Sequence, residues 1–336
     1  MQSKKRDTVT FNTYNMYKFE PILKSMLWGG DKIIPYKGVE SDEKQVGESW
    51  EISGVKGNES VVAEGADAGM KLPELIARDK EALLGKKNFE RFGMEFPLLI
   101  KFIDARQDLS IQVHPDDELA WERHESKGKT EMWYVVDADP GSRLRSGFAK
   151  QVTPEEYEQS IDDNTITDLL QEYDIHKGDV FFLPAGRIHS IGAGAFIAEI
   201  QQTSNITYRI YDFNRCDSTG KPRELHTELS KDAIDYTVLP DYRTYYDAQP
   251  DKATQLVSCS YFTTDIYRLT KEYDMPLAEL DSFVILICTT GKGTITDNNG
   301  NTVSIHQGES ILVPATTTGL KITPEGEMEL LGSWIA

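Results

Sequence analysis

The chain has 336 residues, 39% hydrophobic and 10% aromatic, which is enough to bury the core of one large or two moderate domains. Its formal charge of -19 argues against a nucleic-acid or anionic-membrane partner, because such partners attract basic surfaces. The basic N-terminus lacks the apolar core of a signal peptide, and no apolar run reaches membrane-spanning length. The three cysteines form no paired pattern, which fits a reducing compartment, so we expect a cytoplasmic protein.

The first hundred residues contain short strand-like segments and one amphipathic segment. Between residues 17 and 63 the segments are joined by glycine turns, and we expect the edge of a barrel or a lid. From Pro73 to Phe92 apolar residues recur with a helical period before a glycine, so we predict a packing helix. Residues 97–104 are expected to form a buried strand.

Polar and apolar residues alternate in residues 109–114 and again in 128–134. Alternate side chains of a strand share a face. The residues that this parity places on one face are Ser110, Gln112 and His114 in the first segment and Lys129, Glu131 and Trp133 in the second. An amide, an imidazole, a carboxylate and an ammonium group suit a borderline divalent metal with an anionic substrate beside it. Because any half-exposed strand alternates in this way, a metal site requires a third ligand.

The third ligand is expected in the segment Gly178-Asp-Val-Phe-Phe-Leu-Pro-Ala-Gly-Arg-Ile-His189. A strand from Val180 to Leu183 ends at a Pro-x-Gly bend, and His189 follows the bend. This spacing matches the second signature motif of the cupin barrels. The chain has only six histidines, so two on such strands are unlikely to arise by chance. We therefore predict a metal site that contains His189.

Two more helices are predicted between these segments. One covers residues 116–124, and the other begins at the capping box Thr153-Pro-Glu-Glu156 and runs toward Leu170. We expect His124, which lies among charged residues, to be a solvated residue and not a ligand. His176, in a turn, is expected to be exposed.

Basic residues gather between residues 205 and 226 of this acidic chain, where we expect recognition of an anionic group. Surface ion pairs with Asp212, Asp217 and Glu224 explain Arg223 nearly as well, but they explain Arg209 less well. In the preceding strand, residues 196–202, Glu199 and Gln201 share a face. His226 is expected at the start of a helix.

Beyond about residue 240 the pattern repeats in weaker form. Residues 291–300 are typical of a hairpin, and residues 308–315 repeat residues 178–185 by type, but Gly319 replaces the histidine. We expect a mainly β fold with two cupin (jelly-roll type) barrels and a few packing helices. Residues 1–240 would form the catalytic metal-binding domain. Residues 241–336 would form a barrel without metal ligands that packs on the first barrel or on a partner.

Together these motifs resemble the type I mannose-6-phosphate isomerases, in their short bacterial form, over nearly the whole chain. The motifs that carry the resemblance are Trp28-Gly-Gly, Leu109-Ser-Ile-Gln-Val-His-Pro, Gly128-Lys-Thr-Glu-Met-Trp-Tyr, Pro184-Ala-Gly-Arg-Ile-His, Tyr208-Arg-Ile-Tyr-Asp and Gly220-Lys-Pro-Arg-Glu-Leu-His. The resemblance implies a two-barrel cupin that binds one divalent metal, usually zinc, and interconverts mannose 6-phosphate and fructose 6-phosphate in mannose metabolism. Other divalent metals remain possible.

The resemblance also implies roles for particular residues. The implied roles are metal ligands for His114, Glu131 and His189, a fourth ligand for Gln112, a catalytic arginine for Arg209, an active-site carboxylate for Glu199, and substrate or phosphate contacts for Ser110, Lys129 and Lys221. Gln112 stands where the general cupin motif has a leading histidine. The long helical insertion of larger members is missing here.

The implied reaction fits these groups. Moving a carbonyl between C1 and C2 requires removal of a C–H proton and stabilisation of an enediolate, to which a Lewis-acidic metal and Arg209 are suited. A metal-linked water or Glu199 would carry the proton, although Glu199 is equally suited to pair with Arg209 or Lys129.

Two other functions fit a cupin metal site: an oxygenase acting on a small molecule, and a non-catalytic sugar-binding protein. The set of Gln112, Lys129 and Arg209 favours the isomerase, because an oxygenase needs no phosphate clamp. We expect a phosphosugar substrate, no nucleic-acid or membrane partner, and a monomer or homodimer.

Overall fold

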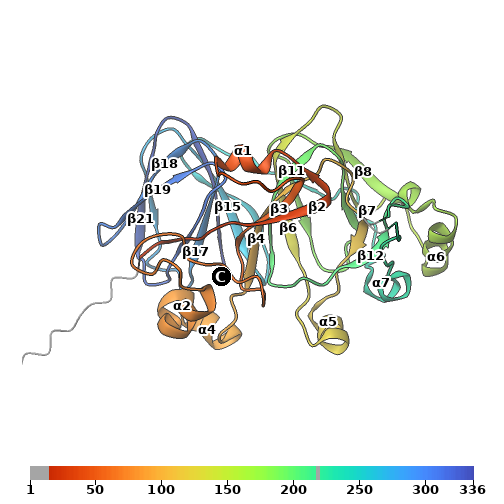
Figure 1. Ribbon diagram of the computed structural model, residues 1–336, viewed down its shortest axis with the longest axis horizontal. Coiled ribbons are helices and arrows are strands. Elements are labelled where there is room, and N and C mark those ends of the chain that lie inside the picture. The colour runs from red at the N-terminus through yellow and green to blue at the C-terminus, as the bar shows by residue number, and fades with distance from the viewer. Residues whose placement is uncertain (1–14, 217–219) are drawn as a thin grey trace, which may run out of the picture.

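The computed structural model describes residues 15–216 and 220–336 and shows a mainly β protein in which two barrels lie side by side (Figure 1). The sequence expectation about a signal peptide falls on residues 1–14, which lie outside the described residues, as does Asp217. Each barrel consists of two antiparallel sheets that enclose an apolar core. The expected fold class is confirmed.

The first barrel contains a seven-stranded and a five-stranded sheet. The seven-stranded sheet has the order β13 (Arg243–Thr244), β9 (Val180–Leu183), β6 (Glu131–Ala138), β11 (Ala195–Gln202), β4 (Leu98–Asp104), β3 (Val46–Ile52) and β2 (Ile22–Gly30). The five-stranded sheet has the order β12 (Tyr208–Tyr211), β5 (Ile111–Val113), β10 (His189–Ile191), β7 (Arg143–Phe148) and β8 (Leu170–Asp174).

The second barrel contains a six-stranded and a four-stranded sheet. The six-stranded sheet has the order β1 (Tyr17–Lys18), β20 (Ser310–Val313), β17 (Val284–Thr290), β22 (Met328–Trp334), β15 (Thr263–Leu269) and β14 (Ala253–Ser258). The four-stranded sheet has the order β16 (Tyr273–Pro276), β21 (Gly319–Pro324), β18 (Lys292–Asp297) and β19 (Thr302–His306). The pairing of β18 with β19 confirms the predicted hairpin.

The central strands of the seven-stranded sheet are buried on both faces. Trp133 of β6 packs into the first barrel, whereas Met132 and Tyr134 pack in a cluster that includes Ile285 and Leu331 of the second barrel. Burial of both faces explains why β4 and β11 are buried along their whole lengths. The predicted buried strand is therefore confirmed. The polar residues of β4 therefore need hydrogen-bond or charge partners inside the protein.

The second barrel packs on the first, which is one of the two arrangements that the sequence analysis left open. Across this contact the Tyr134 hydroxyl donates a hydrogen bond to Glu329 Oε1 at 2.6 Å. We propose that the two barrels are the two domains, divided near residue 240. Two short strands pair across that division: β13 joins the seven-stranded sheet, and β1, near the N-terminus, joins the six-stranded sheet.

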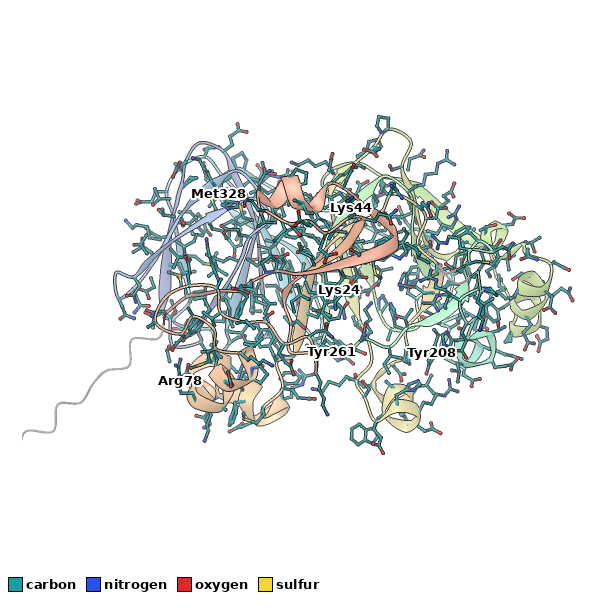
Figure 2. All side chains as sticks on the ribbon, in the orientation of Figure 1. Lys24, Lys44, Arg78, Tyr208, Tyr261 and Met328 are labelled. Carbon is teal, nitrogen blue, oxygen red and sulfur yellow. The ribbon has the colours of Figure 1, made fainter. Side chains whose placement is uncertain are left out.

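Helices cover the ends and outer faces of the barrels, as Figures 1 and 2 show for α2, which carries Arg78. The helices are α1 (Ile33–Lys37), α2 (Leu72–Asp79), α3 (Glu81–Leu84), α4 (Lys86–Phe92), α5 (Asp117–His124), α6 (Pro154–Asp162), the 3-10 helix η1 (Ile166–Leu169) and α7 (Thr227–Ala233). Among the helices described here, none has both the length and the apolar character of a membrane span.

The prediction of one continuous helix from Pro73 to Phe92 is wrong. The segment forms α2, α3 and α4, because Lys80 (φ 48°) and Gly85 (φ 91°) adopt backbone angles that end a helix. The predicted α5 and the Thr153 capping box are confirmed, but α6 ends near Asp163, before an Asn164 that also has a positive φ. A positive φ at a lysine cannot be predicted from the sequence, because lysine seldom adopts it.

Candidate metal centre

Three strands and one turn bring His114, Glu131 and His189 together inside the first barrel. His114 directly follows β5, Glu131 is the first residue of β6, and His189 is the first residue of β10. The turn before β10 is bonded to the other two segments: Gly186 N donates to His114 O at 2.9 Å, and Ala185 N donates to the Thr130 hydroxyl at 3.2 Å. The bend that precedes His189 therefore also fixes the positions of the other two residues.

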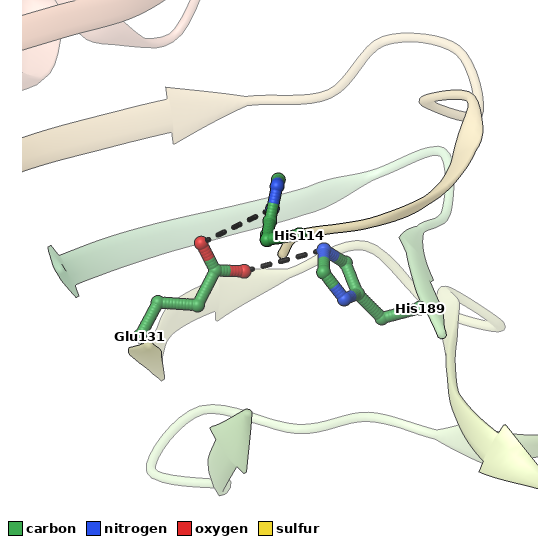
Figure 3. A group of neighbouring side chains, drawn as sticks. All are labelled: His114, Glu131 and His189. Atoms are coloured by element: carbon green, nitrogen blue, oxygen red, sulfur yellow. Dashed lines mark ion pairs between the residues drawn. The ribbon is translucent and has the colours of Figure 1, made fainter. Parts of the chain in front are cut away.

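The three side chains face one another in a nearly solvent-free space (Figure 3). His114 Nε2 lies 3.6 Å from Glu131 Oε2, and His189 Nε2 lies 3.3 Å from Glu131 Oε1. The three potential ligand atoms all lie within 4.8 Å of one another. In the described part of the chain, this is the single group of three or more His, Cys, Asp or Glu residues with the spacing of a metal site.

Hydrogen bonds set the tautomer of both histidines. His114 Nδ1 donates to Ile206 O at 2.9 Å, and His189 Nδ1 donates to Arg187 O at 2.8 Å. The lone pair of each ring therefore lies on Nε2, directed toward Glu131. Burial lowers the pKa of His189 to about 3 and also lowers the pKa of His114 well below its usual value, so both rings are neutral. Neutral imidazoles that keep a lone pair on Nε2 are suited to bind a metal.

Glu131 is fully buried, and neither carboxylate oxygen accepts a hydrogen bond of good geometry from the described residues. Its one close cationic neighbour is Lys129, whose Nζ lies 2.8 Å from Oε2. Burial raises the pKa of Glu131 to about 7, although Lys129 acts in the opposite direction. A buried carboxylate needs a cation beside it, and Lys129 supplies one here. The Glu131 carboxylate and the two neutral imidazoles together form a donor set that fits a divalent metal.

Gln112 lies beside the three residues, as the strand parity predicted. In the five-stranded sheet it stands opposite His189 on β10 and opposite Arg209 on β12. Its amide nitrogen lies 3.2 Å from His189 Nε2. Coordination through Gln112 therefore requires the amide to turn over so that its oxygen faces the metal.

A cavity of about 290 Å³ opens beside this centre. The charged and polar residues that line it are Glu48, Lys101, Ser110, Gln112, Lys129, Glu199, Asn205, Thr207, Arg209 and Arg223. Gln112 and Lys129 connect the cavity to the centre, because they contact His189 and His114 respectively. The cavity is thus a positively charged pocket in an acidic protein, which suits an anionic ligand.

The sequence-predicted residues Ser110, Lys129, Glu199 and Arg209 all line the cavity. Lys221 is exposed and does not line it. Arg209 Nη1 donates to Glu224 O at 3.0 Å, while its buried Nε has no hydrogen-bond partner in the part of the chain described here. Arg209 thus keeps hydrogen-bonding capacity at the cavity.

Arg223 forms the ion pair that the sequence offered as the alternative explanation. Its Nε donates to Asp212 Oδ2 at 2.7 Å, and Arg215 bonds to the same carboxylate. Asp212 therefore offsets part of the positive charge at this end of the cavity. His124 is exposed, as predicted, but it also forms a 2.8 Å hydrogen bond with the Tyr208 hydroxyl.

Sequence reasoning missed Lys101. This buried lysine lies in the middle of β4, and its Nζ lies 3.1 Å from Glu199 Oε1 and 3.7 Å from Glu48 Oε2. A signal was present: a lone lysine within an otherwise apolar buried strand requires a charged partner.

Glu199 pairs with lysines and with Trp133, and no contact with Arg209 is among those observed. Trp133 Nε1 donates to Glu199 Oε2 at 2.9 Å, and Lys129 Nζ lies 4.0 Å from Oε1. Burial opposes ionisation of Glu199, but the charges of Lys101 and Lys129 more than offset it and lower its pKa to about 2. Glu199 is therefore ionised at neutral pH.

Residues 16–165 match the family model described as phosphomannose isomerase type I, catalytic domain, and residues 252–334 match mannose-6-phosphate isomerase, cupin domain. The mannose-6-phosphate isomerase ManA of Bacillus subtilis is 33% identical over 300 residues, which cover 88% of this chain and 92% of that protein. The chain belongs to the type I phosphomannose isomerase family. The Streptococcus mutans mannose-6-phosphate isomerase is also 33% identical, over 91% of this chain and 94% of its own length.

The fold agrees with this relationship. The crystal structure of mannose 6-phosphate isomerase from Bacillus subtilis superposes with a TM-score of 0.85 at 30% identity, covering 95% of this chain and 99% of that one. The structure of a mannosephosphate isomerase homologue from Archaeoglobus fulgidus shares the fold, with a TM-score of 0.78 at 22% identity. The resemblance recognised in the sequence is therefore confirmed.

Proposed function

We propose that the chain interconverts mannose 6-phosphate and fructose 6-phosphate with one divalent metal ion, zinc in the first instance, bound by His114, Glu131 and His189. The observation that carries this proposal is the buried carboxylate of Glu131, which lies 3.3–3.6 Å from the Nε2 atoms of two neutral imidazoles. When bound, the metal would supply a Lewis acid that polarises the sugar carbonyl. Gln112 would be a fourth ligand after its amide turns over.

The charged residues of the cavity would bind and orient the phosphosugar. Lys129 lies beside His114, and Arg209 stands opposite Gln112 on the neighbouring strand. Both would face the sugar oxygens on which negative charge develops in the enediolate. Ser110, also in the lining, would donate a hydrogen bond to the substrate. Lys221 lies outside this lining, so its contact with the phosphate group rests on the resemblance alone and stays a prediction.

Glu199 would act as an active-site carboxylate chiefly through its charge. Its low pKa makes it a weak base, whereas its contact with Lys101 helps to keep that ammonium group charged at the cavity. These contacts support a pairing role for Glu199, which the sequence weighed equally against a role in proton transfer.

The test is isomerisation of mannose 6-phosphate by purified protein, with metal content measured on the same sample. We expect the wild-type protein to form fructose 6-phosphate without consuming dioxygen, and Glu131→Ala to lose both metal and activity. Dioxygen consumption would favour the oxygenase. Sugar binding without turnover in metal-loaded protein would favour the non-catalytic cupin. The oligomeric state, a monomer or a homodimer, and the cytoplasmic location stay predictions.

A further inference from the structure

β12, which carries Arg209, is the outermost strand of the five-stranded sheet. One edge of β12 pairs with β5, where Arg209 stands opposite Gln112. Within residues 15–216 and 220–336 no strand pairs with the other edge, so the backbone groups there need other partners. The position of Arg209 relative to the metal centre therefore depends on what contacts this outer edge.

His226 contacts the outer edge with both its side chain and its backbone. The Arg209 N–H donates to His226 Nδ1 at 3.0 Å, and the His226 N–H donates to Arg209 O at 2.7 Å. Two residues earlier, Glu224 O accepts the hydrogen bond from Arg209 Nη1. The segment 224–226 thus holds both backbone groups of Arg209 and one nitrogen of its guanidinium.

The hydrogen bond to Nδ1 requires a neutral His226. Because the Arg209 N–H is the donor, Nδ1 must keep its lone pair and the ring proton must lie on Nε2. Burial lowers the pKa of His226, and the charge of Arg209 lowers it further. His124 of α5 acts in the same direction and Glu224 acts against it.

Two further contacts of His226 do not involve Nδ1. Its ring lies 6.2 Å from the Tyr208 ring, and Tyr208 lies near α5 and α7 in Figure 2. His226 also precedes α7, where its carbonyl accepts the hydrogen bond from Ser230 N at 2.8 Å. That bond uses the backbone alone, so a substitution at residue 226 can remove the Nδ1 acceptor and leave the backbone at the helix start unchanged.

We propose that His226 is a positioning residue for catalysis: its Nδ1 holds the Arg209 backbone so that the guanidinium is directed into the cavity. This inference rests on the proposed function, which gives Arg209 its role at the enediolate. A misplacement of about 1 Å in a charge-stabilising group can reduce turnover roughly a hundredfold. Loss of the His226 acceptor should therefore lower kcat more than it weakens substrate binding.

Two variants separate the hydrogen bond from the volume of the side chain. His226→Leu keeps an apolar side chain but removes the acceptor, whereas in His226→Asn the amide oxygen can take the place of Nδ1. His306→Asn is the matched control, because His306 is exposed on the second barrel. We expect His226→Leu to lower kcat about tenfold to a hundredfold with unchanged metal content and a KM within about twofold. His226→Asn should restore kcat to within about threefold of the wild type.

The tautomer gives a second readout that does not depend on activity. In protein labelled with ¹⁵N-histidine, the His226 resonances are those lost in His226→Asn, and we expect them to show an unprotonated Nδ1 and a protonated Nε2 at neutral pH. A proton on Nδ1 would overturn the proposal. So would a His226→Leu enzyme with the wild-type kcat, or a His226→Asn enzyme no better than His226→Leu. If the wild type itself does not isomerise mannose 6-phosphate, the proposed function fails. The tautomer measurement alone then tests the hydrogen bond from the Arg209 N–H to His226 Nδ1.

Discussion

Lys101 provides a quantitative test of the buried charges beside the metal centre. Lys101 and Glu199 are 5% and 3% exposed, and the Lys101 ammonium lies 3.1 Å from one carboxylate and 3.7 Å from another. Removal of one partner from a buried ion pair leaves an uncompensated charge and costs about 3–5 kcal/mol. We therefore expect Lys101→Met to lower the free energy of unfolding of the metal-free protein by about 3–5 kcal/mol.

The double variant Lys101→Met/Glu199→Gln is the matched control. It removes both charges from the pair, so it should recover most of the stability that the single variant loses. Urea titration of chelated protein measures all three forms. A Lys101→Met protein as stable as the wild type, or a double variant no more stable than the single one, would refute the pairing of these charges.

The pH dependence follows from Glu199. Its folded pKa is lowered from 4.5 to about 2, so the stability it contributes is present above pH 4.5 and is lost as the pH falls toward 2. The charge of Lys101 lowers this pKa more than that of any other neighbour, so Lys101→Met should raise the pKa of Glu199. The difference in stability between wild type and variant should therefore be largest at neutral pH and shrink in acid.

Three further outcomes are expected. Arg209→Ala should retain metal, measured by elemental analysis, and lose at least about a hundredfold in kcat, since it removes a charge that stabilises the enediolate; a normal kcat would contradict its role. His114→Ala should lose metal and activity together, and an active, metal-loaded variant would exclude His114 as a ligand. Thr153→Ala should cost about 1 kcal/mol of stability, because the Thr153 hydroxyl accepts the hydrogen bond from Glu156 N at the start of α6. Unchanged unfolding by urea would show that this cap does not limit stability.

The metal centre could be predicted from sequence because strand parity and a short turn determine it. Parity alone places Gln112 on the same face as His114, and Glu131 on the same face as Lys129, and the spacing from Gly178 to His189 identifies the turn. The repeat of that spacing at Gly308 predicted the second barrel in the same way. These features depend on local geometry, which a sequence displays directly.

Long-range partners could not be predicted in this way. Lys101 pairs with Glu199 only because β4 and β11 lie side by side, and His226 reaches Arg209 only because β12 is an edge strand. The sequence assigned His226 only to the start of a helix. The division of the helical segment at Lys80 likewise depends on a backbone angle that a lysine seldom adopts.

The most direct measurement of the central claim is the rate of conversion of mannose 6-phosphate to fructose 6-phosphate before chelation, after chelation and after zinc is returned. The account predicts activity that disappears with the metal and returns with zinc. Activity that persists in protein shown to be free of metal would contradict the metal-dependent mechanism, and protein reloaded with zinc that remains folded but inactive on this substrate would contradict the proposed reaction.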